Sequence, residues 1–330
     1  MMSPGAFSSI HRKFLLACAL LLGTASAGAE EALQILEEMA QAADALDYSG
    51  EFVYVSNGQI STLKIVHMQA SEQAPSQQKL MALDGSMREI ILQNDVVACV
   101  LPDQGMGVRE KRQARQLFTL NLSDRIDSID RYYRVTAEGA ARVASRNCDR
   151  IKVSPRDEYR YGYSLCVDQE TRLLLSTELS HPDGHILESY KFVSVEFEEV
   201  KSTEIDSGTP ADSLNWMDDQ PAAADDSPIR PGDTQKWRVS DNPAGFELEY
   251  YIERISPLDK SPVTHLVLTD GLAQVSVFVS AVGEVDPSAT MLNLGSLNGF
   301  REKIEDHVVT VMGEVPQATV ELIAGHTEAY

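Results

Sequence analysis

Three cysteines, Cys99, Cys148 and Cys166, remain after the N-terminal leader and are the residues best placed for chemistry. Strand-like alternation flanks a turn at 155–158, and Cys148 and Cys166 are equidistant from Asp157. In a hairpin centred on Asp157 the two thiols lie directly opposite, at the spacing that a disulfide needs. We therefore predict a Cys148–Cys166 disulfide contributing about 3 kcal/mol. Two free thiols, or a bond from Cys99 to one of them, are the alternatives.

His181 and His185 are the candidates for a metal site, because they flank a Pro-Asp-Gly turn and could meet across a hairpin. Two solvated histidines beside a turn explain the same pattern, and we favour that interpretation. We predict neither a metal site nor a cofactor.

Signatures of catalysis are missing from the sequence. It contains no His-Glu-x-x-His, Cys-x-x-Cys, Gly-x-Ser-x-Gly or Gly-x-x-x-x-Gly-Lys pattern. Acidic residues on the expected strands have no obvious partner for general acid–base work. We therefore expect no catalytic residue and a protein that is not an enzyme.

The N-terminus has the pattern of a secretory signal peptide, residues 1–29. Arg12 and Lys13 precede an apolar run at 14–22. Residues 25–27 (Ala-Ser-Ala) and 27–29 (Ala-Gly-Ala) each have the small-x-small pattern after which a signal peptidase cuts. Cys18 lies inside the apolar run, which argues against a lipoprotein. No second apolar run of about 18 residues follows, so we expect an exported, unanchored protein that acts in the compartment beyond the membrane.

The charge of the chain is strongly acidic. Removing residues 1–29, which hold two of the 28 basic residues and none of the 50 acidic ones, lowers the net charge from −22 to −24. Nucleic-acid binding needs Lys and Arg at phosphates, so we expect no nucleic-acid partner. The length favours two domains.

Residues 30–205 have the pattern of one meandering antiparallel sheet with a helix or two. Apolar residues at helical spacing predict a helix over 30–46. Alternating segments separated by turn residues such as Asn57-Gly58 predict many strands. We interpret 103–115 as a mobile basic loop and 123–133 as a short helix.

Residues 206–235 are polar and rich in proline, as in a linker, although the apolar stretch 214–217 should dock somewhere. A second domain, residues 236–325, follows. For it we predict five strands and a glycine-containing loop at 294–300; the strands are expected at 246–252, 263–269, 274–281, 307–312 and 319–323.

Large residues recur at period-two positions on the first sheet and predict one buried face. Such a face either forms a plain core or leaves a groove for an apolar ligand. As lipid-binding candidates we name the following residues: Phe52, Tyr54, Leu63, Ile65, Tyr161, Tyr163 and Tyr190.

Four stretches, in order, resemble the MucB/RseB family of periplasmic negative regulators of an envelope-stress sigma factor. They begin with Leu-Asp-Gly-Ser-Met-Arg-Glu-Ile, continue with Cys-Asp and Tyr-Arg-Tyr-Gly-Tyr, and end with two stretches in the last third. Their positions are 83–97, 148–163, 270–278 and 307–316.

The resemblance implies an α+β, mostly antiparallel fold. Its N-terminal domain is an unclosed, lipoprotein-carrier-like half β-barrel with covering helices, and its smaller C-terminal domain is a sheet with a helix. It also implies a protein without catalysis that binds the periplasmic domain of a single-pass anti-sigma factor of MucA/RseA type. Binding would shield that factor from site-1 proteolysis, and lipid, lipopolysaccharide or mislocalised lipoprotein would be sensed through the half-barrel.

We expect the anti-sigma contact on the C-terminal domain and on the linker-facing side of the large domain, with four candidate residues: Val275, Val277, Phe278 and Phe300. A homodimer remains open. The alternative function is a periplasmic carrier of lipid or lipoprotein, which would not need the second domain. A hydrolase with an unrecognised site is a third hypothesis.

Overall fold

The computed structural model describes residues 28–42, 44–72, 75–93, 96–111, 129–219, 235–255, 261–283 and 289–330. Within these ranges, no helix is both long enough and apolar enough to cross a membrane. The signal peptide, part of the predicted basic loop (112–115) and residues 123–128 of the predicted short helix lie outside them.

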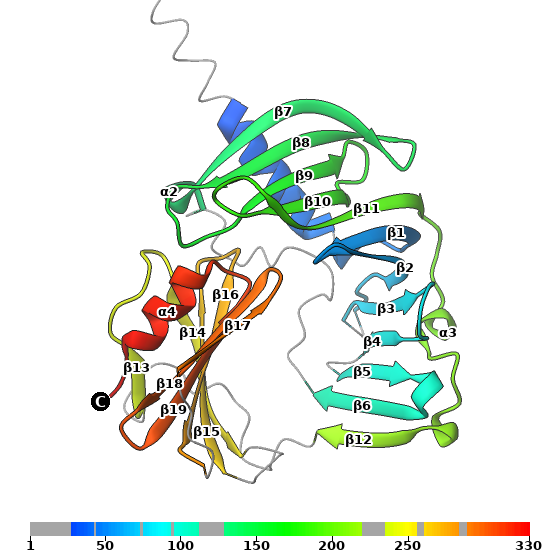
Figure 1. The fold of residues 1–330 in the computed structure, drawn as a ribbon. Coiled ribbons are helices and arrows are strands. Elements are labelled where there is room, and N and C mark those ends of the chain that lie inside the picture. The colour runs from blue at the N-terminus through cyan, green and yellow to red at the C-terminus, as the bar shows by residue number, and fades with distance from the viewer. Residues whose placement is uncertain are drawn as a thin grey trace, which may run out of the picture.

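The N-terminal domain is built on one 12-stranded sheet (Figure 1). Its first meander contains β1 (Tyr48–Ser56), β2 (Gln59–Met68), β3 (Gln77–Ala82), β4 (Glu89–Gln93), β5 (Val96–Leu101) and β6 (Met106–Lys111). Its second contains β7 (Tyr133–Val143), β8 (Arg146–Pro155), β9 (Gly162–Asp168), β10 (Leu174–Ser180) and β11 (Ile186–Glu196).

Pairing of β1 with β11 joins the two meanders, and in the part of the chain that the structure describes the strand order ends at β7 on one side and at β12 (Asn215–Asp219) on the other. The sheet is therefore unclosed, as expected. Asn57 and Gly58, both at positive φ, turn β1 into β2.

A helix over residues 28–42 and 44–45 confirms the predicted N-terminal helix. Its buried residues Ala32, Leu36 and Met39 recur at helical spacing and pack in the same core as Phe52 and Ile65 of the sheet. The helix therefore covers the face of the sheet that carries the large apolar residues. A shorter helix, α2 (Ile129–Tyr132), falls at the end of the range where a helix was predicted.

The basic loop prediction is wrong for its described part. A 3-10 helix, η1 (Pro102–Gln104), is followed by strand β6, because the segment finds partners on both sides. One partner is β5. The other is β12 (Asn215–Asp219), which pairs in parallel and comes from the predicted linker.

Trp216 of β12 explains this docking. Its ring covers the guanidinium of Arg109 at 3.5 Å, and its Nε1 donates a hydrogen bond to the Ala211 carbonyl at 2.9 Å. The expected docking of the apolar stretch in the linker is thus observed. Helix α3 (Ser202–Ile205) and η3 (Ala211–Ser213) precede this strand.

In its described residues, the C-terminal domain contains a six-stranded antiparallel sheet and one helix (Figure 1). Its strands are β14 (Glu247–Ile255), β15 (Pro262–Thr269), β16 (Gln274–Ala281), β17 (Thr290–Leu294), β18 (Leu297–Ile304) and β19 (His307–Gly313). Two short strands, β13 (Trp237–Val239) and β20 (Thr327–Ala329), pair separately.

Two predictions for this domain are wrong. The expected loop at 294–300 contains the turn of a hairpin, β17–β18, with Gly295 at φ +78°. The expected strand at 319–323 is part of helix α4 (Gln317–Gly325). Val320, Ile323 and Ala324 lie on one helical face and are fully buried in the second core, so tertiary packing outweighs the β-branched composition.

Candidate functional site

The predicted lipid-binding residues come together on one face of the N-terminal sheet, but mainly as core. Phe52, Leu63, Ile65, Tyr161, Tyr163 and Tyr190 are each at most 8% exposed and belong to one cluster with the N-terminal helix. Tyr54 is partly buried at its edge. The described conformation therefore fills this face with protein side chains, which is the plain-core alternative.

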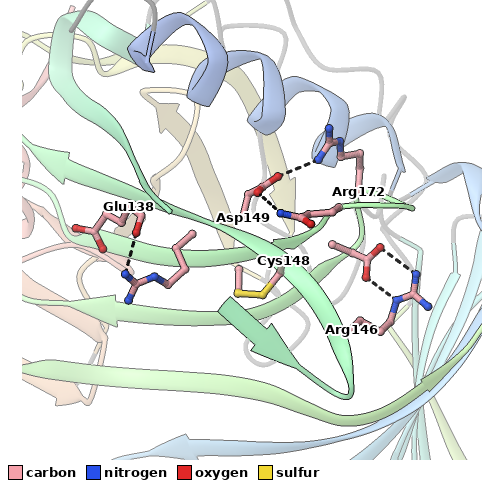
Figure 2. Close-up of a disulfide and its surroundings, with 9 residues drawn as sticks. Glu138, Arg146, Cys148, Asp149 and Arg172 are labelled. Atoms are coloured by element: carbon pink, nitrogen blue, oxygen red, sulfur yellow. Dashed lines mark hydrogen bonds and ion pairs between the residues drawn. A yellow bond between two sulfur atoms is a disulfide. The ribbon is translucent and has the colours of Figure 1, made fainter. Parts of the chain in front are cut away.

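The predicted Cys148–Cys166 disulfide is present, and Cys99 is free (Figure 2). The predicted register is wrong: Cys148 lies opposite Asp168, and Cys166 lies opposite Arg150. The two cysteines are thus diagonal neighbours, with their Cα atoms 5.4 Å apart. The connection between β8 and β9 is longer than a tight turn, which moves the register by two residues.

Charged residues surround the buried disulfide and attach the N-terminal helix to the sheet. Arg172 donates to Asp149 of β8 at 3.2 Å (Figure 2) and to Glu38 of the helix at 2.8 Å. Arg146 donates to Asp168 through Nε and Nη2. Its guanidinium holds the pKa of Asp168 below its usual value, against the opposing effect of burial. This end of the domain is therefore held both covalently and electrostatically.

The two domains contact each other through a buried ion pair. Arg160, from the connection between β8 and β9, places Nε 2.6 Å from Oδ2 of Asp270 in the C-terminal domain, and both side chains are fully buried. The guanidinium also bonds Asp157 and the Ala244 carbonyl. Tyr133 donates to the same Asp270 oxygen at 2.8 Å; burial, and then the Asp270 charge, raises the pKa of Tyr133.

Asp270 is also fixed by its own turn. Its Oδ1 accepts hydrogen bonds from the backbone N–H groups of Leu272 and Ala273 at 3.0 and 2.8 Å. The carboxylate thus joins the β15–β16 turn to Arg160 and Tyr133 of the other domain. Because each of its oxygens has partners, the burial of this charge is compensated.

Polar contacts continue the interface beyond the ion pair. Asn298 donates to the Tyr161 hydroxyl at 2.9 Å, and Ser296 donates to Glu188 at 2.5 Å. Glu188 also accepts from Tyr54 at 2.7 Å. Burial raises the pKa of Tyr161 to about 12, so its hydroxyl stays protonated. Two residues named as lipid-binding candidates, Tyr54 and Tyr161, therefore take part in this second group of contacts.

Little in the amino-acid sequence indicates this interface. Arg160 and Asp270 each lie in a stretch that resembles the family, but their pairing spans 110 positions. The position of Arg160 between Tyr159 and Tyr161 is the available signal, because an arginine buried among aromatic residues requires a carboxylate partner. Identification of that carboxylate required the tertiary structure.

The four predicted partner-contact residues differ in exposure. Val275 and Val277 are fully buried in the second core, so their side chains offer no surface to a partner. Phe278 and Phe300 are partly exposed. These two remain candidates for the contact.

Comparison with known proteins identifies relatives along nearly the whole chain. The MucB/RseB N-terminal domain family matches residues 31–214, and the MucB/RseB C-terminal domain family matches residues 231–328. The chain is 30% identical to the sigma factor AlgU regulatory protein MucB of Pseudomonas aeruginosa, over 94% of this chain and 95% of that protein. It is 27% identical to the sigma-E factor regulatory protein RseB of Haemophilus influenzae, over 95% of this chain and 97% of that protein.

Solved structures give the same result. The complex of Pseudomonas aeruginosa MucA and MucB matches with a TM-score of 0.70 and 27% identity, covering 91% of this chain and 99% of that chain. A crystal structure of MucB with the periplasmic part of MucA matches with a TM-score of 0.68 and 27% identity, covering 90% of this chain and 98% of that chain. Relatives of this chain therefore regulate sigma factors, and one of them has been seen bound to MucA.

Proposed function

The chain belongs to the MucB/RseB family, and from that premise we propose that it is a periplasmic regulator that binds the periplasmic domain of a transmembrane anti-sigma factor. The main support is the agreement of both domains with a relative whose structure contains MucA. The signal-peptide pattern of residues 1–29 supports the location.

Binding would keep the sigma factor inactive by steric protection. The bound anti-sigma segment is held away from the site-1 protease, so the cascade that releases the sigma factor does not begin. This function requires surfaces and a defined domain arrangement, and no reacting group. The buried Arg160–Asp270 pair supplies that arrangement.

The direct test is a protection assay. The periplasmic segment of the cognate anti-sigma factor is incubated with the site-1 protease, with and without the chain lacking residues 1–29. We expect the chain to slow cleavage in proportion to its occupancy of the segment. An unchanged cleavage rate at saturating chain would rule out shielding, and an unrelated substrate of the same protease controls for direct inhibition.

We also propose that lipid or lipopolysaccharide is sensed through the half-barrel. The support is the set of large apolar residues on one face, since burial of an acyl chain contributes about 0.8 kcal/mol per methylene. Because the helix over 28–42 and 44–45 shares the core with these residues, a lipid bound on this face would compete with part of that helix. Displacement of the helix would change the N-terminal domain, which Arg160 and Tyr161 connect to the C-terminal domain.

If the two ligands favour different arrangements, each lowers the affinity for the other by the same factor. Segment affinity measured with and without lipopolysaccharide tests this coupling. Unchanged affinity would contradict the switch and leave binding itself intact. The carrier alternative predicts a different result: deletion of residues 233–330 would preserve lipid transfer, whereas a regulator loses its function.

A further inference from the structure

The turn between β10 and β11 brings together three side chains that can ligate a metal. His181, Asp183 and His185 place their ligand atoms within 4.8 Å of one another. Nδ1 of His181 lies 3.2 Å from Oδ1 of Asp183, and Nδ1 of His185 lies 2.5 Å from the same oxygen. The two imidazole rings are stacked with their centroids 4.8 Å apart. The sequence pattern favoured two solvated histidines beside a turn over a metal site, and it did not include Asp183 among the candidate ligands.

Backbone hydrogen bonds hold this turn in place. His181 N–H donates to the His185 carbonyl at 2.9 Å, and Gly184 N–H donates to the His181 carbonyl at 2.8 Å. Gly184 has φ +95°, a conformation that favours glycine. Asp183 Oδ1 accepts the His185 N–H at 3.1 Å. The three candidate ligands are thus presented by a short, cross-bonded turn, which lowers the entropy cost of gathering them.

We propose that His181, Asp183 and His185 form a binding site for a first-row divalent transition metal, such as Zn²⁺ or Cu²⁺. Two imidazoles and one carboxylate make up the donor set that these ions accept, whereas Mg²⁺ and Ca²⁺ prefer sites built from oxygen. A tetrahedral site needs its ligand atoms about 3.3 Å apart, which rotation of the exposed side chains achieves. Solvent fills the remaining positions, because Asp183 and His185 are exposed.

The site also lies beside the domain interface. The ring of His181 is 6.1 Å from the ring of Tyr161, whose hydroxyl accepts the hydrogen bond from Asn298 of the C-terminal domain. An ion held at the turn would fix His181 next to this contact. Metal binding should therefore raise the thermal midpoint of the folded protein.

The test uses the chain without residues 1–29 and without a histidine tag, freed of metal by chelation and titrated with Zn²⁺ and Cu²⁺ in a calorimeter. We expect one site per chain, with tighter binding of Cu²⁺ and no heat from Mg²⁺. The variants His185→Ala and His181→Ala should lose at least tenfold in affinity. Asp183→Asn keeps the oxygen that accepts the His185 N–H but removes the charge, and should weaken binding.

His326→Ala is the matched control, since His326 is a partly exposed histidine near one carboxylate, with Nε2 4.0 Å from Asp241. It should bind metal like the parent chain. The proposal is overturned if the parent chain binds neither ion, or if His181→Ala, His185→Ala and His326→Ala all bind equally. Circular dichroism of each variant confirms that the loss does not come from unfolding.

Discussion

Arg160 and Asp270 form an ion pair between the two domains, with Nε 2.6 Å from Oδ2 and no exposed side-chain surface on either residue. A buried pair of this kind contributes little net stability, but removal of one partner leaves an uncompensated charge. The pair therefore specifies how the two domains meet. A substitution of either residue should change both the stability of the chain and the arrangement of its domains.

Arg160→Met should destabilise the chain by about 3–5 kcal/mol, because the Asp270 carboxylate stays buried without its cation. Denaturant unfolding measures the change, and small-angle scattering reports the domain arrangement. Adding Asp270→Asn should recover part of the loss, since the amide oxygen still accepts from the turn while the charge is gone. A double variant no more stable than the single one would contradict this account.

Arg238→Met is the control for loss of an arginine. Its Nη2 lies 2.7 Å from Glu328, but both side chains are about half exposed. Exposed pairs contribute about 0–1 kcal/mol, so this variant should unfold like the parent.

Gly107→Ala should release β12 from the sheet. A Cβ at residue 107 would lie 2.5 Å from Cε3 of Trp216, which stacks on Arg109. We expect a loss of about 1–3 kcal/mol and a red shift of the Trp216 fluorescence. Gly283→Ala is the matched control, because a Cβ there meets no atom within 4 Å. Unchanged fluorescence in Gly107→Ala would show that β12 does not dock in this way.

Removal of the disulfide by Cys148→Ala with Cys166→Ala should cost about 3 kcal/mol. Cys99→Ala, which changes a free cysteine, should cost less. Thiol titration of the denatured, unreduced chain without residues 1–29 should find one thiol, that of Cys99. Three thiols would mean that the bond does not form in the exported protein.

His67 should make the chain sensitive to mild acid. It is fully buried, its Nδ1 lies 2.7 Å from the Leu46 carbonyl, and burial lowers its pKa. The unfolded chain takes up the proton at pH about 6.5, whereas the folded chain does so only at lower pH. Stability is therefore complete above that pH and falls as the pH drops towards the lowered pKa.

His67→Asn keeps a donor near Leu46 and removes the titration. Between about pH 7.5 and 5.5, the free energy of unfolding of this variant should change less than that of the parent. At neutral pH the variant should be less stable than the parent. Equal slopes in the two proteins would exclude His67 as the source.

Local pattern was sufficient to predict much of the N-terminal sheet. Alternation and turn residues such as Asn57-Gly58 placed most strands of both meanders, and helical spacing placed the N-terminal helix. These features depend on neighbours in sequence. The cysteine pairing was also predicted, but its register was not: residues 156–161 connect β8 to β9, and the pairing of these strands is not centred on Asp157.

The errors arose where a distant partner decides the structure. Arg109 belongs to a strand because β5 and β12 flank it. Val320 lies in a helix because it packs on the second core. Val275 was predicted to contact a partner, yet it is buried by elements that precede and follow it in sequence. The spacing of apolar residues predicts that a face is buried, but it does not show which element covers that face.

The most direct test of the proposed function is calorimetric titration of the cognate anti-sigma periplasmic segment into the chain lacking residues 1–29. The account predicts saturable binding with a Kd of about 10 µM or tighter, weakened by Phe300→Ala if the partly exposed ring contributes. A parent chain that is folded, with its disulfide formed, and yet gives neither binding heat nor co-elution with the segment would contradict the account.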